Sequence, residues 1–158
     1  MNKSDLKRNL YMLDCTLGKE GYDWWWHSFT AYERKTGKEK AFFIEYYICN
    51  PDKGGDEAIF EPYPSYCMIK VGTWGKDKRE INNFYGINEF KYNKDKLDIT
   101  IGQCTLTEKH MKGTCTLIKD KAMSHKEYMS DYGSMSWDIN IDKKIAYSII
   151  LWRKYVWI

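Results

Sequence analysis

Two long apolar runs joined by a short polar segment constrain the fold of this chain more than any other feature of its sequence. The first run spans residues 22–32 and holds three consecutive tryptophans at 24–26, and the second run spans 41–50. The segment between them contains Gly37, and two such runs joined by a short glycine-containing turn are typical of a β-hairpin. Aromatic side chains also pack well on a pleated surface. We therefore predict an antiparallel hairpin over residues 22–50.

Period-two patterns predict further strands along the rest of the chain. The clearest alternation runs from Ser134 to Ile141, where every second residue is apolar, so this strand has one dry face and one polar face. Within 97–106 the apolar side chains change parity at Gly102, which predicts a β-bulge. The other predicted strands are 66–74, 114–118 and 145–152.

Two short helices complete the expected secondary structure. Ser4 and Asp5 can cap a helix over 4–13, and residues 124–127 have capping-box spacing. Together with about seven strands, these segments predict an all-β fold. An antiparallel sheet of about eight strands that closes into a barrel has no free edges and can enclose one small ligand. We therefore expect an antiparallel barrel or half-barrel with one or two short helices.

Length and charge narrow the possible partners. The chain has 158 residues, the size of one domain, and 43% of them are hydrophobic, which is enough for a core. The 25 basic and 22 acidic residues alternate and form no basic stripe, so we expect no nucleic-acid partner. The apolar C-terminal run is interrupted by Arg153 and Lys154 and is too short for a membrane span, so we expect no transmembrane segment.

Cysteine and histidine usage suggests no metal or cofactor site. The five cysteines contain no Cys-x-x-Cys pair, and the three histidines lie on different segments without metal-ligand spacing. The sequence has no P-loop, dinucleotide fingerprint or Gly-x-Ser-x-Gly motif. The charged N-terminal residues lack the apolar stretch of a signal peptide. We expect a reduced, cytoplasmic protein that uses no metal and no cofactor.

Glu45 and His27 are the candidate acids. Glu45 shares its strand face with Phe43 and Tyr47, and a carboxylate among such neighbours is either hydrogen-bonded or has a raised pKa. A raised pKa would make Glu45 a proton donor near neutral pH, whereas the alternative is a structural carboxylate bound to a tyrosine or an arginine. His27, on the facing strand, could reach Glu45, act as an acid itself, or be a hydrogen-bonded histidine of the core or rim.

The tryptophans and Asp138 are candidates for lining a pocket. Successive residues of a strand point to opposite faces, so the tryptophans at 24–26 place at least one indole on each face. An indole face can stabilise a cation, although tryptophans also pack well in a core. Asp138 alternates with Trp137 and could line a polar lumen or lie in solvent.

The hairpin resembles a motif of the tocopherol cyclase family. The residues that carry the resemblance are WWWHSF at 24–29 and, after a turn, FFIEYYICNP at 42–51. Segments 66–71 and 133–138 resemble further strands of that scaffold, and hydroxyneurosporene synthase-like proteins are more distantly similar. The resemblance covers about residues 22–147. It implies a lipocalin-like barrel or half-barrel over residues 21–158, truncated relative to the two-domain family, after a helical or coil lead at 1–20.

The resemblance also implies a reaction, the redox-free cyclisation of a prenylated phenol or a similar apolar molecule. An acid protonates an alkene, and the phenol oxygen captures the tertiary cation that results. Glu45 or His27 is implied as the acid, and no cofactor is required. The implied substrate-binding residues are Trp24, Trp25, Trp26, Tyr46, Tyr47, Trp137 and Asp138.

A lipocalin-like carrier is the alternative that uses the same residues. It would bind an apolar small molecule in the same cavity without any catalysis. Both hypotheses expect an apolar small-molecule partner. A second β domain, or self-association through the C-terminal strand as an exposed edge, is a further possible partner.

Overall fold

The computed structural model describes residues 21–51, 64–117 and 131–142 of the chain. These residues form nine strands and one short 3-10 helix, and the strands make two antiparallel sheets. The predicted all-β antiparallel fold is therefore confirmed. The two predicted helices and the predicted strand at 145–152 lie outside the described residues.

Sheet A contains the predicted hairpin. Its strands pair in chain order: β1 (Tyr22–Tyr32), β2 (Glu39–Cys49), β3 (Tyr66–Thr73) and β4 (Glu80–Gly86). β1 and β2 pair along their whole length, from Tyr22 opposite Cys49 to Tyr32 opposite Glu39. Gly37 lies in the connecting turn with φ of +67°, a backbone conformation that favours glycine. The hairpin prediction is confirmed in both strands and in the turn.

Sheet B is a five-stranded meander that follows sheet A. The 3-10 helix η2 (Ile87–Glu89) connects the two sheets. The strands of sheet B are β5 (Phe90–Tyr92), β6 (Asp98–Ile101), β7 (Cys104–Thr107), β8 (His110–Leu117) and β9 (Gly133–Asn140). The alternation predicted from Ser134 onward forms β9, in which Trp137 is buried and the neighbouring Ser136 and Asp138 are exposed.

The change of parity at Gly102 is a chain reversal, and the predicted β-bulge is wrong. β6 ends at Ile101, β7 begins at Cys104, and these two residues pair with each other. Gly102 occupies the two-residue turn between them with φ of +55°. A tight hairpin turn and a bulge both shift the side-chain alternation, so the sequence pattern alone did not distinguish them.

Strands β4 and β5 were not predicted from the sequence. Two consecutive asparagines, Asn82 and Asn83, occupy the middle of β4, so the apolar alternation that marks a strand is interrupted there. β5 contains three residues, too few for a periodic pattern. Both strands form because partners on the neighbouring strands complete their hydrogen bonds.

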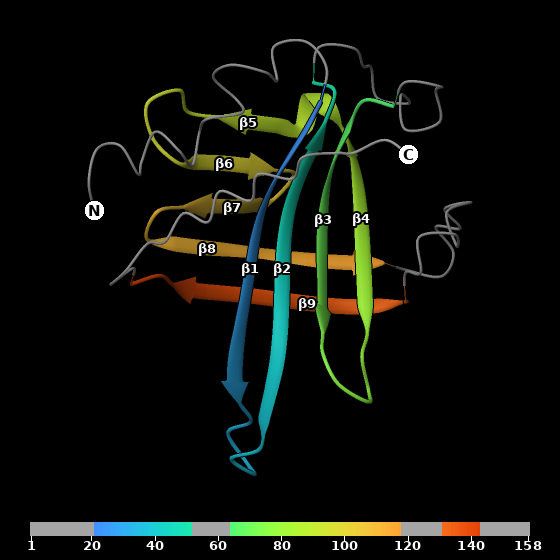
Figure 1. Ribbon diagram of the computed structural model, residues 1–158, viewed down its shortest axis with the longest axis vertical. Helices are drawn as coiled ribbons and strands as arrows, with labels where there is room; N and C mark the ends of the chain where they lie inside the picture. The colour runs from blue at the N-terminus through green and yellow to red at the C-terminus, as the bar shows by residue number, and fades with distance from the viewer. Residues whose placement is uncertain (1–20, 52–63, 118–130, 143–158) are drawn as a thin grey trace, which may run out of the picture.

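The two sheets form two layers. The strands of sheet A run across those of sheet B (Figure 1), as in orthogonal sandwich packing. Among the described strands the hydrogen-bonded ladders of the two sheets stay separate, so they form no closed barrel, which is consistent with the half-barrel expectation. Within the described ranges, no helix has the length and apolar character that crossing a membrane requires.

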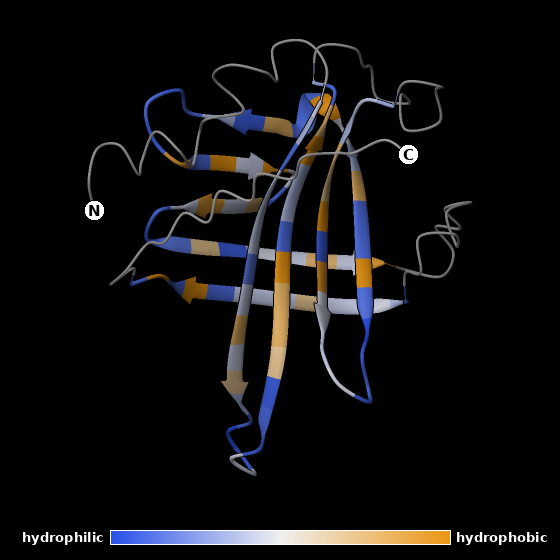
Figure 2. Ribbon diagram, viewed as in Figure 1, coloured by the Kyte–Doolittle hydropathy of each residue, from blue (hydrophilic) through white to orange (hydrophobic). Residues whose placement is uncertain are grey.

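The core fills the space between the sheets. In Figure 2 the most apolar part of β2 lies where this strand crosses sheet B. Trp25 of β1 packs against Phe90 of β5 with ring centroids 6.4 Å apart. Several core side chains have no exposed surface: Ile44, Tyr46, Ile48, Ile69 and Val71 from sheet A, and Ile99, Ile101 and Leu106 from sheet B.

Tyr46 joins the two layers through hydrogen bonds as well as packing. Its hydroxyl donates to the carbonyl oxygen of Thr105 at 2.8 Å and accepts the Trp137 indole N–H at 3.3 Å. The two rings meet edge to face at 6.5 Å. The buried phenol of Tyr46 therefore both donates and accepts a hydrogen bond. Gly113 makes room for the Trp137 indole, because a Cβ at this position would be 2.5 Å from the ring and 2.6 Å from the Cys104 sulfur.

We expect Tyr46→Phe to destabilise the fold without changing its shape. The substitution leaves the Trp137 N–H and the Thr105 carbonyl without this partner, which costs about 1–3 kcal/mol of unfolding free energy. Urea denaturation followed by circular dichroism measures the difference. Tyr92→Phe is the matched control, because Tyr92 is 44% exposed and should lose almost nothing. Equal losses in both variants would contradict the role of Tyr46.

A second prediction concerns Asp23, which faces the core side of β1. Burial raises the pKa of its carboxyl to about 6, although the backbone N–H of Trp24 donates to this carboxylate at 2.8 Å and opposes the shift. The folded protein thus holds the proton more tightly than the unfolded chain. The contribution of Asp23 to stability is complete below about pH 4 and is lost as the pH rises through 6.

The Asp23→Asn variant should lack this part of the pH dependence. We expect its unfolding free energy to change less than that of the wild type between pH 4 and pH 7, as measured by urea titrations at several pH values. Asp98→Asn, at a carboxylate on β6 that pairs with Lys96 at 3.2 Å, serves as the control. An Asp23→Asn profile parallel to that of the wild type would refute the assignment.

Candidate ligand-binding face

The outer side of sheet A carries two groups of aromatic side chains. Alternate residues of each strand point away from sheet B, and on β1 these residues include Tyr22, Trp24 and Trp26. We call this surface the aromatic face. Its aromatic members are Tyr22, Trp24, Trp26, Phe43, Tyr47, Tyr66 and Phe84, together with Trp74, which follows β3. Apolar rings exposed together on one surface mark a candidate interaction site.

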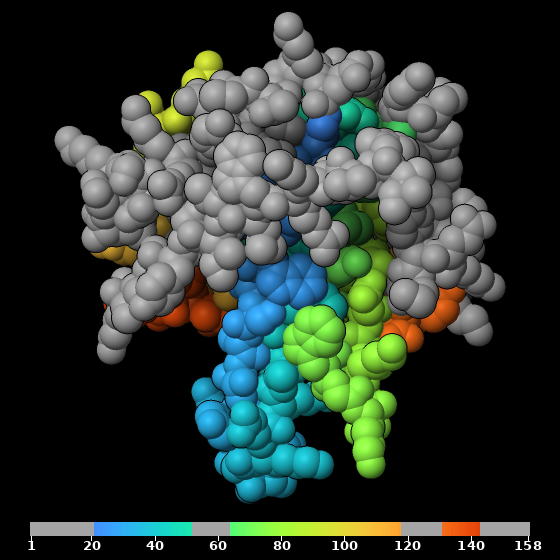
Figure 3. Space-filling view, viewed as in Figure 1, coloured from blue at the N-terminus to red at the C-terminus, as the bar shows by residue number. Residues whose placement is uncertain are grey.

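One group of rings surrounds Phe43. Trp26 stacks on Phe43 with centroids 4.8 Å apart, and Trp74 packs against Phe43 at 5.0 Å. Phe43 itself lies over Gly72, where a Cβ would come within 2.5 Å of the phenyl ring. Trp26 and Trp74 remain 40% and 52% exposed. Figure 3 shows bare rings of β1 and of the segment after β3 side by side on this face.

A second group of rings lies toward the start of β1. Tyr22 stacks with Trp24 at 5.6 Å and with Tyr47 at 6.2 Å. Tyr66 continues the group from Tyr47 to Phe84 on β4, with centroid distances of 5.7 Å and 5.4 Å. Trp24 is 49% exposed and Tyr22 is 52% exposed. The rings of this group therefore pack against one another, and Tyr22 and Trp24 remain about half exposed to solvent.

A polar row crosses the face between the two groups. Trp26 of β1 pairs with Glu45 of β2, Glu45 pairs with Lys70 of β3, and Lys70 pairs with Asn82 of β4. The Lys70 ammonium forms an ion pair with Glu80 at 3.2 Å. The Asn82 amide donates to the same Glu80 oxygen at 3.3 Å. The positive charge of Lys70 is therefore already paired with Glu80.

Glu45 is the chemically distinctive residue of the row. Its carboxylate is half-buried and makes no hydrogen bond or ion pair in the part of the chain that the structure describes. Burial raises the pKa of Glu45, the positive charge of Lys70 lowers it, and the negative charge of Glu80 raises it again. A carboxylate in this setting gains free energy from any additional positive charge.

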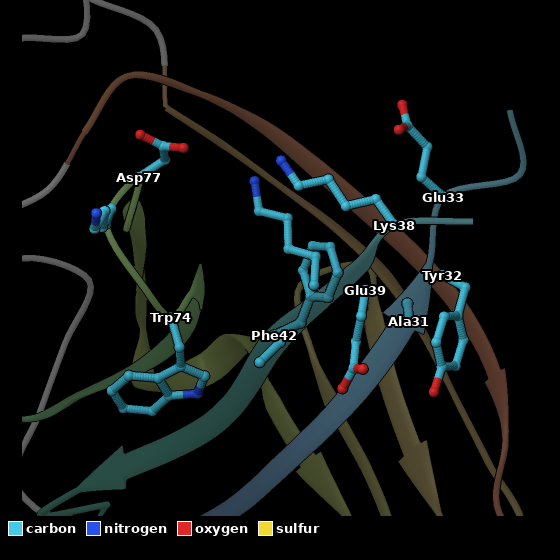
Figure 4. A pocket seen from close by; sticks show the side chains of 11 residues that line it. Ala31, Tyr32, Glu33, Lys38, Glu39, Phe42, Trp74 and Asp77 are labelled. Carbon is cyan, nitrogen blue, oxygen red and sulfur yellow. The ribbon is translucent and has the colours of Figure 1, made fainter. Parts of the chain in front are cut away.

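A separate cleft lies where sheet A extends beyond sheet B. The β1–β2 and β3–β4 turns project past β9, the edge strand of sheet B (Figure 1). The cleft between these turns has a volume of about 590 Å³ and is lined by Phe42, Trp74, Tyr32 and charged side chains that include Lys38 and Asp77 (Figure 4). Trp74 thus contributes to both the cleft and the aromatic face.

The structure brings four of the predicted site residues together on the aromatic face: Glu45, Trp24, Trp26 and Tyr47. His27 lies opposite Ile44 and therefore points to the other side of the sheet. The expectation that His27 could reach Glu45 is corrected, because their side chains lie on opposite faces. Glu45 pairs with Trp26, the residue directly before His27. The sequence could not align the two strands to single-residue accuracy.

The remaining predicted residues lie elsewhere. Trp25, Tyr46 and Trp137 are buried in the core between the sheets. Asp138 lies on the outer side of sheet B, where one carboxylate oxygen is 2.7 Å from His110 Nε2 and the other is 2.8 Å from Lys112 Nζ. These ion-pair partners and the outward position correct the expectation that Asp138 lines a lumen, and they match its solvent-exposed alternative.

Several residues of the face were not singled out from the sequence, and they include Lys70, Glu80, Phe43 and Trp74. Lys70 is the only charged residue within the apolar strand β3, and that isolation is a signal the sequence did offer. The position of Glu80 depends on β4, which had no recognisable pattern. Trp74 lies one residue past the end of β3, although the predicted strand 66–74 included it and gave it the same parity as Lys70.

Comparisons with known proteins add no relative to this geometry. No family model matches the chain, and neither a curated protein nor a solved structure matches it. The resemblance to the tocopherol cyclase family therefore has no support from these comparisons.

Proposed function

We propose that this chain is a binding protein that holds an apolar, ring-containing small molecule against the aromatic face of sheet A. The observation that carries the proposal is the exposure of Tyr22, Trp24, Trp26 and Trp74 on one surface, each 40–52% exposed. Apolar rings that are exposed together on one surface of a folded protein mark sites that bind a ligand or a partner. Binding without catalysis was the alternative hypothesis from the sequence.

The proposed ligand binds on the outer surface of sheet A and not inside the fold. Side chains fill the space between the two sheets and leave no room for a ligand there. Residues such as Ile44, Ile69 and Ile99 have no exposed surface there. Protein interiors packed in this way leave few voids larger than a water molecule. A ligand therefore finds its apolar surroundings on the outer side of sheet A.

Ring stacking gives the expected strength of binding. An aromatic pair contributes about 0.5–1.5 kcal/mol beyond the burial of its area, and burial adds about 25 cal/mol per Å² of apolar surface. A ligand that contacts two indoles also loses translational and rotational freedom when it binds. We therefore expect affinities weaker than those of an enclosed barrel cavity.

Cyclisation is a second candidate function, and Glu45 is the reason to keep it. This half-buried carboxyl has a raised pKa and lies beside Trp24 and Trp26, so a proton donor and aromatic rings share one surface. A tertiary cation intermediate requires the exclusion of water. Trp24 and Trp26 are 49% and 40% exposed, and for this reason we rank binding first.

Removal of the two exposed indoles tests the proposal. N-phenyl-1-naphthylamine, a neutral fluorescent probe, should bind the wild type and become more fluorescent. The variant Trp24→Ala/Trp26→Ala should bind it about tenfold more weakly, because two stacking contacts are lost. Tyr92→Ala, at an exposed ring of sheet B, is the control and should bind as the wild type does. Circular dichroism confirms that each variant is folded.

Unchanged probe affinity in the folded double variant would overturn the proposed binding face. Incubation of the wild type with a prenylated hydroquinone, followed by mass spectrometry and chromatography, separates the two candidate functions. Recovery of unchanged substrate supports binding. Formation of a cyclised isomer that disappears in Glu45→Gln would establish the second candidate in its place.

A further inference from the structure

We propose that the ligand of the aromatic face is an organic cation, whose ammonium group lies between the carboxylate of Glu45 and the indoles of Trp24 and Trp26. This inference rests on the proposed binding function and specifies the chemical class of its ligand. It follows from the register of the hairpin, the charges of the polar row and the fixed positions of the rings.

Register places the carboxylate and both indoles within reach of one bound group. Glu45 lies directly opposite Trp26, and Trp24 lies opposite Tyr47, the next residue of β2 on the same face. Directly opposite residues have Cβ atoms about 4.5–5.5 Å apart, and diagonal neighbours are about 7–8 Å apart. An ammonium group attracted by an indole lies within about 6 Å of the ring centroid. A cation bound to Glu45 can therefore contact either indole.

The charge of the polar row is one negative unit in excess when Glu45 is ionised. Its charged members are Glu45, Lys70 and Glu80, and Lys70 forms its ion pair with Glu80 at 3.2 Å. β1 adds no charge, because the outward side chains of this strand are Tyr22, Trp24, Trp26, Ser28, Thr30 and Tyr32. Glu45 thus keeps an uncompensated charge in half-buried surroundings, and a cationic ligand neutralises it.

The rings are held in place before any ligand binds. The Trp26 indole N–H donates to the Ser28 hydroxyl at 2.7 Å, and one face of the same indole stacks on Phe43 at 4.8 Å with an interplanar angle of 11°. Tyr22 supports Trp24 through a stacked contact at 5.6 Å. Fixed side chains lose little entropy on binding, so the attraction between cation and ring is retained in the affinity.

The same residues discriminate against a metal ion. Divalent cations require several oxygen or nitrogen ligands, and Ca²⁺ takes six to eight oxygens. The described residues contain no group of three or more His, Cys, Asp or Glu side chains that could hold a metal. One carboxylate beside indole rings instead suits a large, weakly hydrated cation with apolar substituents.

Choline and its neutral carbon isostere, 3,3-dimethylbutan-1-ol, test the inference directly. The two molecules have the same shape and differ in one positive charge. Titration at pH 8 followed by tryptophan fluorescence should show that the wild type binds choline about tenfold or more tightly than the alcohol. Glu45→Gln should abolish this preference. Glu89→Gln should retain this preference, because Glu89 is an exposed residue of η2, the 3-10 helix that connects the two sheets.

A second substitution allows Lys70 to neutralise Glu45 while the carboxylate and both indoles remain in place. Glu80→Gln frees Lys70 from its ion pair, and the ammonium can then pair with Glu45, its direct neighbour across β2 and β3. We expect the preference for choline over 3,3-dimethylbutan-1-ol to fall several-fold. A structural defect in the face would lower both affinities.

The pH dependence gives a further readout from the same groups. Glu45 faces Lys70 on β3 and Glu80 on β4, and the outward side chains of β1 are uncharged. Choline affinity should decrease as the pH falls through the raised pKa of Glu45, because protonation removes the negative charge. Glu45→Gln should bind choline equally at all pH values in this range.

The outcomes separate this inference from the proposed function. Equal affinity of the wild type for choline and for the alcohol, or no binding of choline, overturns the cationic ligand. Loss of the naphthylamine probe in the tryptophan double variant would still support the binding face in that case. Failure of the probe to bind the wild type at all would overturn the proposed function and the inference together.

Discussion

The phenol of Tyr46 joins the two layers of this protein, and its place in the core determines which side chains face outward. Its hydroxyl contacts Thr105 and Trp137, both in sheet B. Side chains alternate along a strand, so the neighbours of Tyr46 on β2, Glu45 and Tyr47, must lie on the opposite side of the sheet. A one-residue slip of β2 would exchange the two sets and place a carboxylate in the core, which is strongly unfavourable.

The same alternation divides the aromatic side chains of the hairpin between the core and the aromatic face. Trp25 packs against Phe90 in the core, whereas Trp24 and Trp26 lie on the aromatic face beside Glu45. The buried rings fill the space between the sheets and exclude water from it. The exposed indoles of Trp24 and Trp26 lie next to the Glu45 carboxylate. The proposed ligand binding therefore requires no internal cavity.

The elements that sequence reasoning identified are those with long apolar runs, such as the β1–β2 hairpin, or with strict alternation, such as β9. The elements it missed or misassigned are short or interrupted. Gly102 permits both a bulge and a turn, and the asparagines of β4 hide a strand whose hydrogen bonds are completed by β3. For the site, the sequence predicted Glu45 and Trp24 as members. It did not predict Lys70 and Glu80, whose charges act on the Glu45 carboxylate. These two residues lie on β3 and β4, and although Lys70 stands out as the one charge of β3, no local pattern shows that it lies beside Glu45.

The sequence by itself determined that this chain forms antiparallel sheets and that consecutive tryptophans lie on opposite faces, because the geometry of a strand makes side chains alternate whatever surrounds it. Only the tertiary structure decided which face became the core. Sheet B covers one side of sheet A, and that packing buried Trp25, Tyr46 and Trp137 while Glu45 stayed outside. The physical reason is that period-two patterning does not distinguish between two faces that are both apolar, and the second layer settles the choice by removing one of them from water.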